Sequence, residues 1–141
     1  MLSVEQKDKV ASSLRLAAGL MQTVAIASSS SEYEIRNAIS RLYYAFFHAS
    51  VALLVSIGWE TQGISKDHGK IHAAVQARMG KYMGTFLRKL YQNRKLCDYD
   101  SSMFERSYGR DLAKARRDVI LDIKRAKTNF HWIYQEARKV L

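Results

Sequence analysis

The chain has 141 residues, a length that fits one domain over residues 1–141, and 48% of them are hydrophobic, which is enough for a packed core. The formal net charge of +10 favours an acidic partner, and RNA or a nucleotide comes first among such partners. The single cysteine, Cys97, excludes an internal disulfide and a cysteine-based metal cluster.

The composition points to helices. The sequence contains no proline and only 7 glycines, and no segment alternates steadily between apolar and polar residues, so we expect no β-sheet. A first helix is expected at about residues 4–27, where apolar residues recur at spacings of three and four. The start, MLSVEQKDKV, lacks the basic and then apolar pattern of a signal peptide, so we expect a cytoplasmic protein.

Serines at positions 28–31 mark a loop, and a second helix is expected at about residues 32–57. Ser31 and Glu34 have the spacing of a capping box, in which each side chain satisfies a free backbone N–H of the first turn. Gly58 can adopt the left-handed conformation that ends a helix. Polar residues interrupt the longest apolar run, which falls short of the roughly 20 residues that cross a bilayer, so we expect no membrane partner.

Three further helices are expected after this one. A short helix covers about residues 66–79 and stops at Gly80, a fourth covers about 82–96, and a long last helix begins at 110 or 111. Turn-forming residues at 97–102 separate the last two. The last helix carries an apolar stripe made of Leu112, Ala115, Val119, Ile123, Ala126, Phe130, Ile133 and Ala137. Five helices with short links predict an all-α fold, an up-and-down antiparallel helical bundle.

A polar edge runs along the otherwise apolar second helix. Residues three or four apart share one helix face, and this spacing joins Asn37, Arg41, Tyr44 and His48. Arg41 keeps its charge, so its burial would require an acidic or carbonyl partner. His48 titrates near neutrality unless it is perturbed. These side chains either line a functional groove or lie hydrogen-bonded at the edge of the core.

A second polar set closes the fourth helix. Arg94 and Asp98 are four residues apart and can form an ion pair if the helix continues through both. Such a pair would orient the guanidinium, although an exposed ion pair contributes only about 0–1 kcal/mol. Tyr99 follows at the point where we expect the helix to break.

His68 and His72 are also four residues apart, a spacing that can bind zinc. No third ligand lies nearby in HGKIH, since Lys70 does not bind metal as a cation. We therefore interpret both histidines as ordinary helix residues and expect neither a metal site nor a cofactor.

Basic residues cluster on the fourth and last helices. Charges with helical spacing commonly form a solvated face, but two clusters that faced one groove would bind phosphates. Tyrosines near such a groove would stack on exposed bases. The candidate nucleic-acid-binding residues are Arg88, Lys89, Lys95, Arg116, Arg117 and Tyr44.

Three segments in this order resemble the HEPN domains: ISRLYYAFFHASVALL at 39–54, DHGKIH at 67–72 and YQNRKLCDYD at 91–100. With the long last helix, the resemblance covers about residues 30–140. The order and spacing of the segments match one branch of small stand-alone prokaryotic HEPN proteins, of the kind encoded beside a nucleotidyltransferase. It implies an antiparallel helical bundle that is usually a homodimer. The family often has a His near position 68, which suggests that this side chain packs against the second helix.

Many HEPN domains are metal-independent RNases of toxin–antitoxin, anti-phage and CRISPR-associated systems. Their motif is an Arg followed, after four to six residues, by a His. Arg94 matches its start, but Asp98 stands near the place of the His, and a carboxylate carries protons near neutral pH only if its pKa is raised. Arg41 and His48 have the motif's spacing on another helix. In relatives paired with a nucleotidyltransferase, a Tyr just after the His can be modified with adenylate, which points to Tyr99.

These observations predict an RNA- or nucleotide-binding HEPN protein of a toxin–antitoxin or defence module, with activity as a metal-independent endoribonuclease left open. In this hypothesis Arg94 contacts phosphate, Asp98 orients it, and His48 carries the proton, in a cleft near a dimer interface that also includes Arg41 and Tyr99. The alternative is a non-catalytic structural partner that docks a nucleotidyltransferase or another effector through its helix faces. The missing His after Arg94 favours the alternative.

Overall fold

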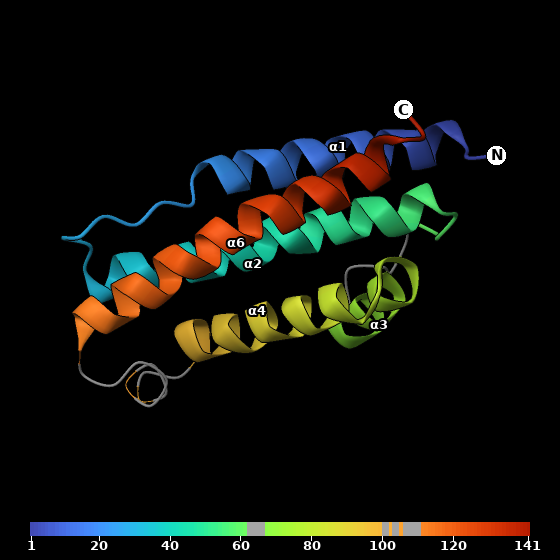
Figure 1. Cartoon of the computed structure of the whole chain (residues 1–141). Coiled ribbons are helices and arrows are strands. Elements are labelled where there is room, and N and C mark those ends of the chain that lie inside the picture. Colours follow the sequence, from blue (N-terminus) through green and yellow to red (C-terminus); the bar gives the residue numbers. More distant parts are fainter. Residues whose placement is uncertain (62–66, 100–101, 103–104, 106–110) are drawn as a thin grey trace.

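The computed structural model describes residues 1–61, 67–99, 102, 105 and 111–141, without the side chain of Tyr99. The described residues form five helices and no strand: α1 (Val4–Gln22), α2 (Glu32–Ser56), α3 (His68–Met79), α4 (Lys81–Tyr99) and α6 (Leu112–Arg138). The long helices run alternately up and down, and the short α3 lies beside α4 (Figure 1). The predicted all-α, up-and-down antiparallel bundle is therefore confirmed.

Helix α2 is the centre of the bundle and packs against α1, α3, α4 and α6. The ring of Phe46 lies 5.1 Å from that of Phe86 in α4 and 5.7 Å from that of Phe130 in α6, so one side chain joins three helices. By length and composition α2 could cross a membrane, but 78% of its most apolar stretch is buried inside the protein. The apolar character of α2 is therefore explained by its central position in the core.

The local signals for the ends of α2 and α3 are confirmed. The hydroxyl of Ser31 accepts a hydrogen bond from the backbone N–H of Glu34 at 3.2 Å, and the Glu34 carboxylate accepts one from the backbone N–H of Ser31 at 3.1 Å. Gly58 and Gly80 have φ angles of 107° and 105°, which residues with a Cβ rarely adopt. These residues end their helices as the sequence predicted.

Helix α1 ends at Gln22, earlier than the expected end near Ala27. Thr23 caps the helix, and its hydroxyl donates a hydrogen bond to a carbonyl of the last turn at 2.7 Å. The following segment is held from outside, since Arg116 of α6 donates to the carbonyl of Ser30 at 2.7 Å. This tertiary contact favours a non-helical connection after α1. The apolar periodicity of the sequence alone could not distinguish this connection from a continued helix.

Helix α4 continues to Tyr99, so the turn predicted at 97–102 begins too early. Arg36 of α2 donates a hydrogen bond to the carbonyl of Cys97 at 2.9 Å. Arg94 and Asp98 form an ion pair of 3.4 Å within the last turn. These two contacts extend the helix through residues that favour turns. Residues 100, 101, 103 and 104 lie outside the described residues.

Helix α6 begins one residue after its N-cap, Asp111, whose carboxylate accepts a hydrogen bond from the backbone N–H of Ala113 at 2.9 Å. The predicted apolar stripe faces the core along nearly its whole length, and Phe130 within it is half-buried. Leu112 is the exception: it is 37% exposed because it lies at the first residue of the helix. The stripe therefore starts one turn later than the sequence suggested.

Gly84 lies where α4 closely approaches α3. A Cβ atom at this position would lie 2.5 Å from the Cβ of Gln76 in α3, far inside van der Waals contact. The side chain of Gln76 is itself engaged, because its amide oxygen accepts a hydrogen bond from Arg88. A Cβ atom added at Gly19 in α1, in contrast, would have no such neighbour within 4 Å. Gly84 therefore permits the packing of α3 on α4, whereas Gly19 has no such role.

We expect Gly84→Ala to destabilise the protein by about 1–3 kcal/mol, because the strain of overpacking exceeds the gain in helix propensity. The matched control Gly19→Ala should stabilise it by about 0.5–1 kcal/mol, since the added methyl group meets open space. Urea unfolding followed by far-UV circular dichroism measures both. Stabilisation of similar size by both substitutions would contradict the close approach at Gly84.

Candidate functional site

Polar and aromatic side chains gather where α2, α3 and α4 meet. Tyr43 comes from α2, His68 and His72 from α3, and Tyr91 and Arg94 from α4; these residues are named here the Tyr–His–Arg cluster. Tyr43 is completely buried, and His72 and Arg94 are only 2% and 5% exposed. Burial of polar groups is unfavourable unless they are hydrogen-bonded, so the partners of each group matter.

The hydroxyl of Tyr43 joins the two histidines. It lies 2.5 Å from Nδ1 of His68 and 3.0 Å from Nε2 of His72. A hydroxyl has one proton, so it donates to one imidazole and accepts from the other. Burial raises the pKa of Tyr43 well above its ordinary value of 10.0, and the hydroxyl therefore keeps its proton near neutral pH.

Aromatic contacts fix the orientation of His68. Its ring stacks on Phe47, with centroids 4.6 Å apart, and on Tyr91, with centroids 5.1 Å apart. Such ring pairs contribute about 0.5–1.5 kcal/mol beyond the burial of their area. His68 is nevertheless only half-buried, in contrast to His72. Of the two imidazoles, His68 is therefore the one that a ligand can reach.

Arg94 is enclosed by aromatic rings. Its guanidinium carbon lies 5.3 to 5.4 Å from the ring centroids of Tyr43, Tyr44 and Tyr91, a cation–π arrangement. Its Nη1 donates to the hydroxyl of Tyr44 at 3.0 Å and pairs with Asp98 at 3.4 Å. The predicted Arg94–Asp98 pair is therefore present, but with an arginine side chain that is only 6% exposed rather than on the surface.

The charge states of the histidines follow from their surroundings. Burial, then His68 and then Arg88, lower the pKa of His72 to about 4. Burial, then the charge of Arg94, lower the pKa of His68, and the carboxylate of Asp67 only partly opposes them. Both imidazoles are therefore neutral near pH 7, so that each has one donor nitrogen and one acceptor nitrogen.

Arg41 and His48 make no described contact with this cluster. Arg41 is exposed and His48 is half-buried. Burial and the nearby ammonium of Lys9 in α1 lower the pKa of His48, which shows that its ring is close to α1. Among the described contacts, none joins Arg41 or His48 to Arg94. The structure thus brings together Arg94, Asp98 and Tyr44 from the predicted site, and the side chain of Tyr99 lies outside the described residues.

The candidate nucleic-acid-binding cations have varied surroundings. Arg88, Lys89 and Arg117 are exposed, whereas Lys95 and Arg116 are half-buried. Lys89 lies 3.8 Å from Asp122 of α6, and this ion pair partly neutralises its charge. The ammonium of Lys95 lies 4.7 Å from the ring centroid of Tyr91, at the border of the Tyr–His–Arg cluster. Lys95 is therefore a predicted cation that contacts this cluster.

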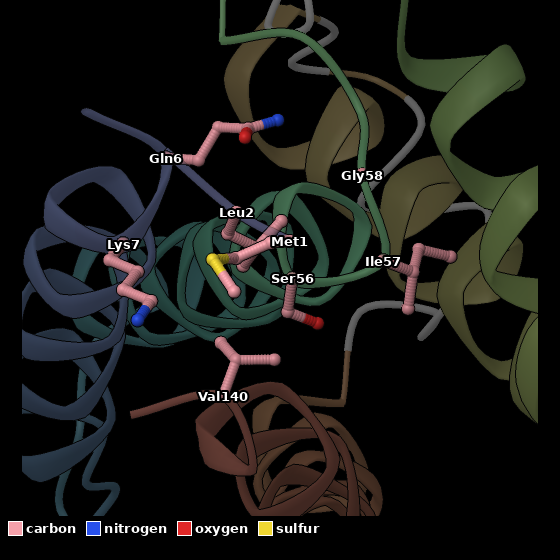
Figure 2. A pocket seen from close by; sticks show the side chains of 8 residues that line it. All are labelled: Met1, Leu2, Gln6, Lys7, Ser56, Ile57, Gly58 and Val140. Carbon is pink, nitrogen blue, oxygen red and sulfur yellow. The ribbon is translucent and has the colours of Figure 1, made fainter. Parts of the chain in front are cut away.

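Cavities also lie elsewhere on the protein. One of about 480 Å³ lies at the end of the bundle that holds both termini (Figures 1 and 2). Its lining residues are Met1, Leu2, Gln6, Lys7, Ser56, Ile57, Gly58 and Val140. A smaller one, of about 190 Å³, lies between α4 and α6 and is lined in part by Phe86, Lys89 and Asp122. The large cavity has one charged side chain and no acid–base pair, so it offers little chemistry.

The two histidines of α3 have a common hydrogen-bond partner. In the part of the chain that the structure describes, no group of three or more His, Cys, Asp or Glu side chains is arranged to hold a metal ion. His68 and His72 instead share the hydroxyl of Tyr43, so the expected packing of His68 against the second helix is confirmed. The sequence reasoning missed their connection to Tyr43.

In comparisons with known proteins, no family model, no curated protein and no solved structure matches this chain.

The protein should lose stability as the pH falls from about 6.5 towards 4. Folded His72 stays neutral down to about pH 4, whereas unfolded His72 binds a proton near 6.5, so the unfolded state binds more protons in this window. The contribution is fully present above pH 6.5, and roughly 3 kcal/mol is lost below pH 4. Urea unfolding at several pH values measures it. His72→Gln should flatten this dependence, and the same substitution at exposed His131 should not.

Proposed function

We propose that the protein is a HEPN-like protein that binds RNA or a nucleotide and works in a toxin–antitoxin or defence module. One observation carries the proposal: the three segments that resemble HEPN domains meet in a single cluster. Segment 39–54 supplies Tyr43 and Tyr44, segment 67–72 supplies both histidines, and segment 91–100 supplies Tyr91, Arg94 and Asp98. Residues that only mark a fold need not converge on one polar site.

The charge of the chain supports an anionic ligand. The formal net charge is +10, and the exposed cations Arg88 and Lys89 lie on α4, the helix that carries Arg94. Lys95, at the border of the cluster, follows on the same helix. A nucleic acid that binds such a surface releases counterions, which favours binding at low salt. The buried Arg94 would add a fixed positive charge behind this surface.

Cleavage of RNA without a metal, which the resemblance implies, requires a group that exchanges protons near neutral pH close to Arg94. Asp98 is a poor candidate, because it is paired with Arg94 and accepts a hydrogen bond from Ser40 at 3.3 Å. Asp98 is better suited to hold Arg94 in place.

A second candidate function is the docking of a nucleotidyltransferase or another effector by a non-catalytic partner. The outer face of α6 favours it, because Leu121 and Trp132 are 46% and 45% exposed. They are eleven residues apart, close to three helical turns, and so lie on one face. Exposed apolar side chains that share a face often mark a protein interface. A second copy of the chain, as in the expected homodimer, could use the same face.

Binding of a labelled single-stranded RNA, followed by fluorescence polarisation, tests the first function. The affinity should fall by more than about tenfold between about 50 and 200 mM salt. Arg88→Gln combined with Lys95→Gln should weaken binding by about tenfold at low salt, since two cations near the cluster are lost. The matched control, Arg15→Gln with Lys139→Gln, removes two cations from α1 and the C-terminus and should change the affinity less than about twofold. Binding that is indifferent to salt would exclude this mechanism.

The second function predicts a stable complex with a nucleotidyltransferase encoded beside this protein. Trp132→Ser should weaken that complex at least about tenfold, because it removes a large apolar contact from the docking face.

Mass spectrometry after incubation with the partner and ATP would test Tyr99, where we expect an adenylate adduct. A stable complex without any adduct on Tyr99 would sink the modification hypothesis.

A further inference from the structure

An imidazole contacts the same tyrosine rings as Arg94, although no His stands at the motif's spacing after Arg94 in the sequence. The His68 ring centroid is 5.7 Å from that of Tyr43 and 5.1 Å from that of Tyr91. The guanidinium of Arg94 lies 5.4 and 5.3 Å from the centroids of the same two rings. Arg94 is also near enough to lower the pKa of His68. The fold therefore brings His68 from α3 to the two tyrosine rings that Arg94 of α4 also contacts.

We propose that His68 is the proton carrier of the Tyr–His–Arg cluster and acts as general base in metal-independent cleavage of RNA, an inference that rests on the proposed function. Nδ1 of His68 is engaged by the hydroxyl of Tyr43, which leaves Nε2 as the ring nitrogen for the substrate. His68 is half-buried, so this ring combines a fixed orientation with access. His72, only 2% exposed, lacks that access.

Tyr43 and His72 act as positioning residues. In the active arrangement, Nδ1–H of His68 donates to the oxygen of Tyr43, and the Tyr43 hydroxyl donates to Nε2 of His72. The Tyr43 hydroxyl then accepts one hydrogen bond and donates one, and Nε2 of His68 carries a lone pair and no proton. This series of hydrogen bonds requires a neutral His72, and the burial that lowers the pKa of His72 to about 4 keeps it neutral.

The charges around His68 suit a base. Burial has the largest effect on the pKa of His68 and lowers it. The guanidinium of Arg94 on α4 lowers this pKa further, whereas Asp67, the N-cap of α3, raises it. On α2 the neighbouring Tyr43 keeps its proton. His68 is therefore unprotonated near pH 7, when a base must accept a proton. Arg94 is a permanent positive charge behind the same tyrosine rings, where it favours negative charge that develops at the cluster.

The proposed reaction balances without a metal, an oxidant or added water. Nε2 of His68 takes the proton of the ribose 2′-hydroxyl, and the 2′-oxygen forms a bond to the adjacent phosphorus. The bond from phosphorus to the 5′-oxygen breaks, and the imidazolium returns the proton to that leaving oxygen. The products are a 2′,3′-cyclic phosphate and a 5′-hydroxyl, and His68 is regenerated.

The test compares wild-type protein with His68→Asn on a single-stranded RNA in the presence of a chelator. We expect wild type to give the cyclic phosphate product, identified by mass spectrometry. His68→Asn should cleave the RNA at least about 100-fold more slowly than wild type. Its RNA affinity should stay within about twofold of wild type. The matched control His131→Asn, exposed on α6, should cleave as wild type does.

Two further measurements separate chemistry from misfolding. Added imidazole should restore part of the cleavage by His68→Asn, which no loss of folding would allow. The wild-type rate should rise with pH to a midpoint below 6.5 and then level off, because the burial and positive charge that lower the pKa of His68 leave it unprotonated above that midpoint. Tyr43→Phe, which removes the hydrogen bond to Nδ1, should shift this midpoint and lower the rate.

Each failure has a distinct meaning. Cleavage by His68→Asn at the wild-type rate would overturn the role of His68. Wild-type protein that binds RNA in a salt-dependent manner but cleaves none would overturn the catalytic inference and leave the proposed binding function standing. Wild-type protein that binds no RNA at low salt would overturn the proposed function itself.

Discussion

The buried hydroxyl of Tyr43 is the constraint on which the arrangement of α2, α3 and α4 depends. Tyr43 lies in the central helix, completely enclosed by protein, so its hydroxyl requires partners from neighbouring helices. The two histidines of α3 supply them and fix α3 against α2. Gly84 then allows α4 to approach α3 closely, which brings Tyr91 and Arg94 to the same rings. One polar atom thus organises three helices.

The cluster is difficult to explain by stability alone. An arginine that is 5% exposed must lose its hydration, and a buried ion pair such as Arg94–Asp98 often contributes little net stabilisation. A well-packed apolar side chain could occupy the same space in a core that is otherwise built of aliphatic and aromatic residues. Polar groups with lowered pKa values beside a fixed charge are typical of functional sites. This contrast is the physical basis for assigning function to the meeting point of α2, α3 and α4.

The ends of the helices separate local from non-local control. The capping box at Ser31 and the stop at Gly80 were predictable, because each depends on backbone groups a few residues away. The ends of α1 and α4 were predicted wrongly. Arg116, from a helix far along the chain, holds the segment after α1, and Arg36 binds the carbonyl of Cys97 near the end of α4. Such contacts leave no periodic signal in the sequence.

The sequence by itself determined the all-α bundle, the apolar faces of its helices and the pairing of Arg94 with Asp98, since spacings of three and four residues bring side chains together on any helix. Only the tertiary structure decided which imidazole accompanies Arg94. His48 has the motif's spacing from Arg41 but lies near α1, whereas His68 reaches Tyr43 across 25 residues of chain. The packing of α3 against α2 and α4 brings His68 to Tyr43. No local repeat in the sequence encodes this contact.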